Sequence, residues 1–195
     1  KAGQIPLWNP YNFSGTPLLA NYQSQALYPL GVLYLILPQV VAWTVFVILQ
    51  PLLGSIFLYL FATEIGLSVG AAIVAGILFN FSSFASSWME FNTVWHTILW
   101  LPLILYILER GIKHTYITRG NKIIFMFALF SSINGGHPQD FIYTFLFFIL
   151  YTGIRLATLS NWTSDKKLSF IIGQLSLITG IPFLLASPQL LPTIE

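Results

Sequence analysis

The chain lacks cysteine and has very little charge. Of its 195 residues none is cysteine, and only 14 are charged, as 8 Lys and Arg and 6 Asp and Glu. The lack of cysteine excludes disulfides, thiolate metal sites and cysteine nucleophiles. The shortage of charge excludes a water-soluble globule of this size, because its surface would need far more polar cover, and it gives no support to nucleic acid as a partner. The 56% of hydrophobic residues instead indicates an integral membrane protein.

Uncharged runs predict the fold class. A helix needs about 20 apolar residues to cross the hydrocarbon core of a membrane. Six runs bounded by polar residues or by glycine and proline are predicted as spans, at roughly 40–62, 69–87, 92–108, 123–136, 140–158 and 168–187. A shorter run between prolines, PLGVLYLILP at 29–38, predicts a helix lying in the membrane interface. The expected fold is therefore all-α: a polytopic transmembrane helix bundle of about six spans over residues 39–195, preceded by an extracytoplasmic loop and a short interfacial helix over 1–38.

The basic residues predict the orientation of these spans. Positively charged loops stay in the cytoplasm. With six alternating spans, one side holds Arg110, Lys113, Arg119, Lys122, Arg155, Lys166 and Lys167, and the other side holds only Lys1. The amino-terminal segment, the turn at 88–91, the GGHPQD turn at 135–140 and the carboxy-terminal end are then expected to be extracytoplasmic. A chain that opens on Lys1 rather than methionine is also expected to be a fragment of a longer protein.

Five ionisable residues fall at or just below the predicted outer surface: Glu90, His96, His137, Asp140 and Glu195. Ionisable residues at membrane depth are costly and are therefore candidates for function. The GGHPQD turn also has a purely structural interpretation. Pro138 suits the first turn of a helix, Asp140 would meet free backbone N–H groups there, and His137 would be the cap. For Glu90 the structural alternative is a solvated loop carboxylate, and for the turn both interpretations remain open.

The first 30 residues are rich in amides, aromatic rings, proline and glycine, with little helical periodicity. Amide and aromatic side chains are suited to binding carbohydrate or lipid head groups. The blocks GQIPLWNPY at 3–11, GTPLLAN at 15–21 and YPL at 28–30 resemble the YfhO family of bacterial membrane proteins, a group similar to the GT-C glycosyltransferases that use lipid-linked sugars. Three further blocks agree with the resemblance: YLFATEIGLS at 59–68, GGHPQ at 135–139 and SPQLLPTIE at 187–195.

The resemblance implies a reaction and its partners. It implies transfer of a sugar from a polyprenyl-phosphate carrier to a cell-envelope acceptor at the outer face of the bacterial cytoplasmic membrane, among membrane lipids and other envelope glycosylation proteins. Such a reaction needs a carboxylate to accept the acceptor's proton, and hydrogen-bond donors or a divalent metal to stabilise the leaving phosphate. The candidate catalytic residues are Asp140, Glu90 and His137, and the candidate substrate-binding residues are Trp8, Asn9, Gln23, His96 and Gln139.

One departure from the family pattern concerns the catalytic base. GT-C enzymes carry their catalytic acidic residue early in the first outer loop, whereas residues 1–30 of this chain contain no Asp or Glu. The resemblance therefore places that residue upstream of Lys1, and Glu90 and Asp140 are candidates by position only.

Two alternatives belong to other functional classes. A transporter or flippase of lipid-linked sugar would need a continuous polar pathway, for which the chain offers Gln50, Asn80, Ser82, Ser83 and Gln174. A non-catalytic partner in envelope glycosylation would not require the outer polar residues to converge.

Overall fold

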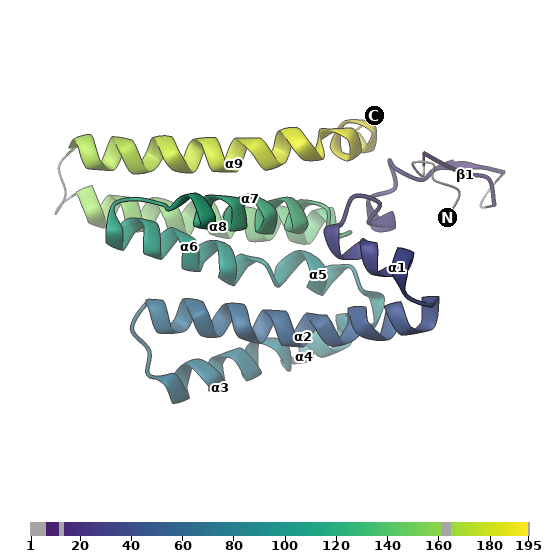
Figure 1. The fold of residues 1–195 in the computed structure, drawn as a ribbon, viewed down its shortest axis with the longest axis horizontal. Coiled ribbons are helices and arrows are strands. Elements are labelled where there is room, and N and C mark those ends of the chain that lie inside the picture. The colour runs from purple at the N-terminus through teal and green to yellow at the C-terminus, as the bar shows by residue number, and fades with distance from the viewer. Residues whose placement is uncertain (1–6, 12–13, 161–164, 195) are drawn as a thin grey trace.

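Long helices lying side by side make up most of the molecule (Figure 1). The computed structural model describes residues 7–11, 14–160 and 165–194, with the side chains of all these except 159–160, 165–168 and 194. Expectations that concern Lys1, Lys166, Lys167 and Glu195 fall outside these residues or side chains. Helix α2 (Gln39–Glu64) packs on α3 (Val69–Asn80) and α6 (Leu101–His114). Helix α7 (Arg119–Ile133) packs on α6 and α9 (Asp165–Ile194), so the middle of the bundle is built from α6 and α7.

Three helices are long and apolar enough to cross a membrane. They are α2 (Gln39–Glu64), α8 (Pro138–Ser160) and α9 (Asp165–Ile194), with apolar stretches at Gln39–Glu64, Pro138–Thr158 and Ser169–Thr193. They match the first, fifth and sixth of the predicted spans. Only 22%, 11% and 33% of the most apolar stretches of α2, α8 and α9 are buried within the described chain, as expected of helices that face lipid.

The second predicted span is a bent pair of helices. Helix α3 (Val69–Asn80) ends after 12 residues, and α4 (Ser83–Trp88) restarts at an angle of 43° to it. The break has a local cause, because the Ser82 hydroxyl accepts a hydrogen bond from the Ala85 amide and so caps a new helix. If this pair counts as one broken span, the described chain has four candidate spans rather than three.

The third and fourth predicted spans are shorter than a membrane. The third is divided into α5 (Val94–Ile98) and α6 (Leu101–His114), with a proline in the first turn of α6. The fourth is α7 (Arg119–Ile133), whose 15 residues extend about 22 Å against a hydrocarbon core of about 30 Å. The helical fold class is thus confirmed, while six full-length spans are not found in the part of the chain described.

The amino-terminal segment folds into short elements. Strand β1 (Trp8–Asn9) pairs antiparallel with β2 (Thr16–Pro17), and the 3-10 helix η1 (Tyr22–Ser24) follows. The short helix predicted at 29–38 is present as the 3-10 helix η2 (Pro29–Val32) continued by α1 (Leu33–Ile36), and its place in a membrane interface stays a prediction. A third such helix, η3 (Met89–Phe91), links α4 to α5.

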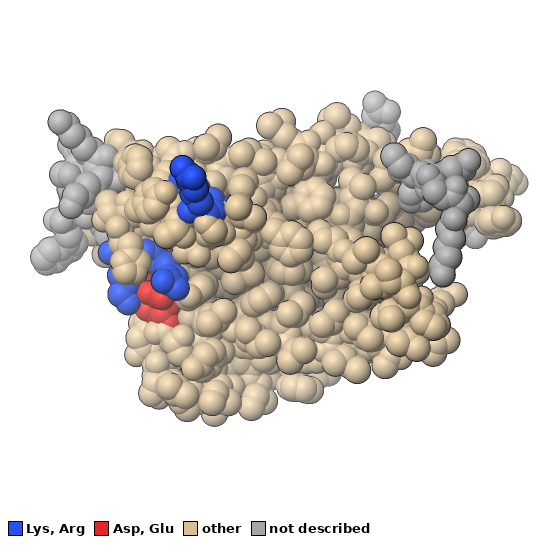
Figure 2. Space-filling model, in the orientation of Figure 1, with Lys and Arg blue, Asp and Glu red and all other residues tan. Residues whose placement is uncertain are grey.

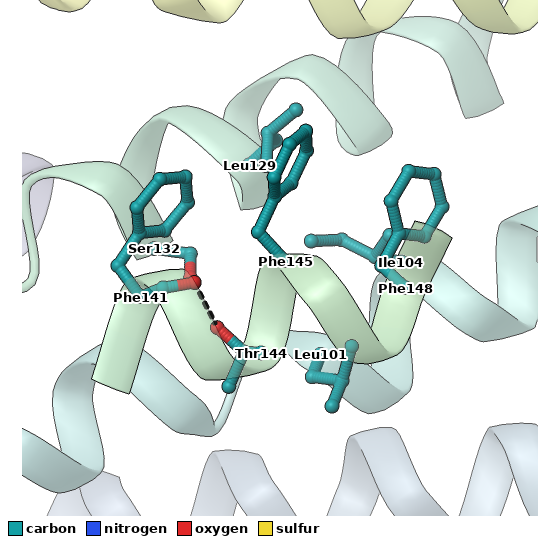
Figure 3. A pocket seen from close by; sticks show the side chains of 8 residues that line it. All are labelled: Leu101, Ile104, Leu129, Ser132, Phe141, Thr144, Phe145 and Phe148. Carbon is teal, nitrogen blue, oxygen red and sulfur yellow. Dashed lines mark hydrogen bonds between the residues drawn. The ribbon is translucent and has the colours of Figure 1, made fainter. Parts of the chain in front are cut away.

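Aromatic side chains fill the contact between α8 and its neighbours. Figure 3 shows Phe141, Phe145 and Phe148 of α8 beside Leu129 of α7 and Ile104 of α6. The Thr144 hydroxyl donates to the Phe141 carbonyl of its own helix, which satisfies the hydroxyl within this apolar contact. The remaining cavity of about 10 Å³ is at most the size of one water, so this contact is closely packed.

Charge separates the two ends of the bundle. The turns after α2 and α6 lie at one end (Figure 1), and we name it the cationic end after its basic side chains: Arg110, Lys113, Arg119, Lys122 and Arg155. Figure 2 shows basic side chains gathered there on an otherwise nearly uncharged face. The opposite end, named the loop end, holds residues 7–11 and 14–38 and the α7–α8 turn at 134–137. The predicted collection of basic residues at one end is confirmed for these five, and the side of a membrane that each end faces stays a prediction.

Candidate functional site

The glycines of the GGHPQD turn allow the α7–α8 connection to touch α5 and the amino-terminal segment. A Cβ atom at Gly135 would lie 2.7 Å from the Thr97 Cα and 2.8 Å from its backbone nitrogen. Gly136 has a φ of +99°, which favours glycine, and a Cβ there would lie 2.7 Å from the Gln25 Cγ. The glycine pair is therefore explained by close packing as well as by the turn.

Hydrogen bonds fasten the amino-terminal segment to the same turn. The Gln25 side-chain amide donates to the Gly135 carbonyl at 2.5 Å and to the Asn92 carbonyl at 2.7 Å. The Tyr22 hydroxyl donates to the Ile133 carbonyl. Burial raises the pKa of the Tyr22 phenol above its ordinary value, so the hydroxyl keeps its proton and its role as donor. These contacts join residues more than 60 positions apart into one structure at the loop end.

His137 and Asp140 lie together at the start of α8. His137 Nδ1 is 2.7 Å from Asp140 Oδ2, and the two side chains are 24% and 13% exposed. The His137 carbonyl accepts the first helical hydrogen bond, from the Phe141 amide, so His137 occupies the cap position and Pro138 the first turn. The Trp88 ring lies beside the imidazole, with 6.4 Å between ring centres. The structure thus contains both features expected of this motif, a helix start and an acid–imidazole pair.

The other two ionisable candidates do not join this pair. Glu90 is exposed in η3 and makes no hydrogen bond or ion pair with a described residue. His96 is completely buried, with Nδ1 2.8 Å from the Tyr28 hydroxyl and Nε2 3.2 Å from the Phe46 carbonyl. A neutral ring with its hydrogen on Nε2 satisfies both partners. The imidazole of His96 therefore packs the core of the loop end instead of facing a ligand.

The remaining candidates lie on the surface. Trp8 is 57% exposed and covers Gly15 across the β1–β2 pair, where a Cβ would meet the indole ring at 2.5 Å. The Asn9 side chain accepts from the Tyr11 amide. Gln23 and Gln139 are exposed, and Gln139 donates to the Tyr143 hydroxyl one turn further along α8. These polar groups are available to a ligand, although no described cavity gathers them.

A polar network at the cationic end was not predicted from the sequence. Arg155 donates to Glu109 through Nε at 2.6 Å and Nη2 at 2.8 Å, and the Tyr151 hydroxyl donates to the same carboxylate at 2.7 Å. Basic residues in this region were interpreted only as topology signals. Tyr151 and Arg155, one helical turn apart on α8, were the available sign that this helix presents a polar edge there.

A divalent metal has incomplete support among the described residues. His137 and Asp140 supply two potential ligands. In residues 7–11, 14–160 and 165–194, no three His, Asp or Glu side chains lie close enough together to hold a metal ion. The described side chains alone therefore do not make a metal site.

Comparison of the chain with protein-family models, with curated proteins and with solved structures gave no match. The functional interpretation therefore depends on the geometry above and on the sequence resemblance.

Proposed function

We propose that the chain is part of a GT-C-like membrane glycosyltransferase that moves a sugar from a polyprenyl-phosphate carrier to a cell-envelope acceptor at the loop end. The observation that carries the proposal is the His137–Asp140 pair, an acid and an imidazole 2.7 Å apart at the end opposite the basic residues. Such pairs are suited to proton transfer. The sequence resembles the YfhO family, which is similar to the GT-C glycosyltransferases that use lipid-linked sugars. The aromatic and amide residues of the amino-terminal segment suit a sugar ligand.

The chemistry assigns a role to each group. The acceptor hydroxyl attacks the anomeric carbon of the sugar, the bond from that carbon to the phosphate oxygen breaks, and the polyprenyl phosphate leaves with its electron pair. Asp140 accepts the hydroxyl proton. His137 orients the Asp140 carboxylate and stabilises its negative charge. The amino terminus of α8, a helix of 23 residues, favours the negative charge that develops on the phosphate.

Transport of lipid-linked sugar is less well supported. Its polar pathway required Gln50, Asn80, Ser82, Ser83 and Gln174 to face one cavity, yet Ser83 is exposed and the other four are engaged at separate contacts. Gln50 donates to Met89 and Asn92, Asn80 bonds Ser55 and Trp95, Ser82 caps α4, and Gln174 accepts from the Ile117 amide. A non-catalytic partner in envelope glycosylation remains the second candidate, because Glu90 and His96 lie apart from the His137–Asp140 pair.

Replacement of Asp140 by Asn separates proton transfer from the packing of the first turn of α8. Asparagine has nearly the size and shape of aspartate and keeps an acceptor oxygen, but it cannot accept a proton. In the full-length protein, Asp140→Asn is expected to abolish the envelope sugar modification, measured by mass spectrometry of isolated envelope glycans, at an unchanged protein level. Glu64→Gln, which removes a carboxylate at the cationic end, is the matched control. Retained modification in Asp140→Asn would remove Asp140 from the mechanism and favour the partner role.

A further inference from the structure

A cavity of about 440 Å³ opens at the cationic end, lined by residues of α2, α6 and α8. This volume lies in the range of about 300–1,000 Å³ that is typical of ligand sites. Its polar lining consists of Glu64, Glu109, Lys113, Tyr151 and Arg155. Two carboxylates and two cations in one cavity suit a ligand that itself carries both signs of charge.

The two ion pairs of the cavity differ in how firmly they are held. The Glu109 carboxylate is 7% exposed and bound by three donors, so it fixes Arg155 in place. The Lys113 side chain is 64% exposed, the Glu64 side chain is 15% exposed, and the two meet at 3.1 Å through a single contact. A single contact to an exposed lysine contributes little to stability. The Lys113–Glu64 pair can therefore exchange partners with a ligand at little cost.

The carboxy-terminal ends of two helices favour a positively charged group in the cavity. Helices α2 and α6 both finish at this cavity, at Glu64 and His114, and the carboxy terminus of a helix carries partial negative charge. A purely anionic ligand would meet this charge and two carboxylates. An ammonium group beside Glu64 would be stabilised by the carboxylate and by the negative ends of the helices. A phosphate would reach Lys113 and the outer edge of Arg155.

The surroundings of the cavity are apolar. Ile65 and Ile112 line it, and Leu150 and Ile154 on α8, which flank Tyr151 and Arg155 in sequence, are strongly exposed. In a membrane such residues would contact acyl chains, so a ligand here has a polar head in the cavity and a tail along the helices.

We propose that this cavity binds the head group of an amino-phospholipid, with the phosphoethanolamine ammonium on Glu64 and its phosphate on Lys113 and Arg155. Phosphatidylethanolamine satisfies both signs of charge in the cavity. Phosphatidylglycerol lacks the ammonium, and the methylated ammonium of phosphatidylcholine cannot donate a hydrogen bond to the carboxylate. The site is independent of the chemistry at the loop end.

Native mass spectrometry of the delipidated full-length protein tests the proposal. Dioleoyl phosphatidylethanolamine, phosphatidylglycerol and phosphatidylcholine are added separately at equal concentration, with inorganic phosphate as a fourth probe. The expected result is an affinity for phosphatidylethanolamine at least about fivefold above that for the other two lipids, which corresponds to about 1 kcal/mol. Binding of inorganic phosphate with the same dependence on Lys113 would overturn the lipid assignment in favour of a free phosphate site.

Variants separate the cavity from general attraction to the cationic end. Lys113→Gln and Glu64→Gln are expected to remove the preference, and both positions are exposed or peripheral enough for the protein to keep its fold. Lys122→Gln is the control, because this lysine lies over the Tyr116 ring, 5.3 Å from its centre, and does not line the cavity. An equal loss in Lys122→Gln, unchanged binding in Lys113→Gln, or tighter binding of phosphatidylglycerol would each overturn the proposal.

Discussion

Replacing Gly135 by alanine tests how the loop end is held together. The added Cβ would lie 2.7 Å from the Thr97 Cα and 2.8 Å from its backbone nitrogen, and neither atom can rotate away. Ordinary contact begins near 3.4 Å, so α5 and the α7–α8 turn would have to separate by more than half an ångström. That movement would stretch the hydrogen bond from Ser132 Oγ to the Thr97 carbonyl, now 2.8 Å, and the bond from Gln25 to the Gly135 carbonyl, now 2.5 Å.

The magnitude follows from these contacts. Overpacking a closely packed contact costs about 1–3 kcal/mol, and weakening two hydrogen bonds adds about 1 kcal/mol. We therefore expect Gly135→Ala to lower the free energy of unfolding by about 2–4 kcal/mol, measured as a shift of several degrees in the thermal unfolding midpoint of the purified protein in detergent. Gly173→Ala is the control, since a Cβ at this position in α9 meets nothing within 4 Å and alanine favours a helix by up to about 1 kcal/mol. Equal stability of the two variants would refute the packing argument.

Three further substitutions test separate parts of the account. Glu109→Gln breaks the partly buried network at the cationic end and is expected to lower the free energy of unfolding by about 1–3 kcal/mol, between the values for exposed and buried pairs. Glu64→Gln is expected to lower it by less than about 1 kcal/mol. Equal effects of the two variants in denaturant unfolding would contradict the difference in burial. Tyr28→Phe leaves a buried imidazole and a buried indole without their shared hydroxyl, so a loss of about 2–3 kcal/mol is expected in the same assay, and a neutral result would show that the hydroxyl is not needed. Gln25→Ala is expected to increase hydrogen exchange in residues 14–30, while Gln23→Ala, whose side chain is exposed, leaves it unchanged; identical exchange in both would remove Gln25 as the fastening residue.

The sequence predicted the long helices because their signal is local. An uncharged run of 20 or more residues, as at 40–62, specifies a membrane-type helix without reference to its neighbours. The helix pairs α3–α4 and α5–α6 were predicted as the single spans 69–87 and 92–108. The break within each pair depends on one or two residues, which is a weaker sequence signal than a long apolar run. A serine cap at Ser82 and a proline at Pro102 divide these runs, and hydropathy alone does not register either residue.

The candidate site was predictable in part for the same reason. His137 and Asp140 are three residues apart at a helix start, so the sequence brings them together by helical geometry. The burial of His96 depends on Tyr28 and Phe46, which are 68 and 50 positions away, and no local pattern encodes those contacts. The same holds for Glu109 and Arg155, whose pairing at the cationic end requires α6 and α8 to meet.

Release of polyprenyl phosphate is the measurement that tests the central claim most directly. The purified full-length protein in lipid vesicles is supplied with a panel of undecaprenyl-phosphate hexoses and an extract of envelope acceptor, and free undecaprenyl phosphate is quantified for wild type, Asp140→Asn and Glu64→Gln. Proton acceptance by Asp140 predicts release by wild type and Glu64→Gln and a loss of about 100-fold or more in Asp140→Asn. Equal release by Asp140→Asn and wild type would contradict the assignment of the His137–Asp140 pair to catalysis.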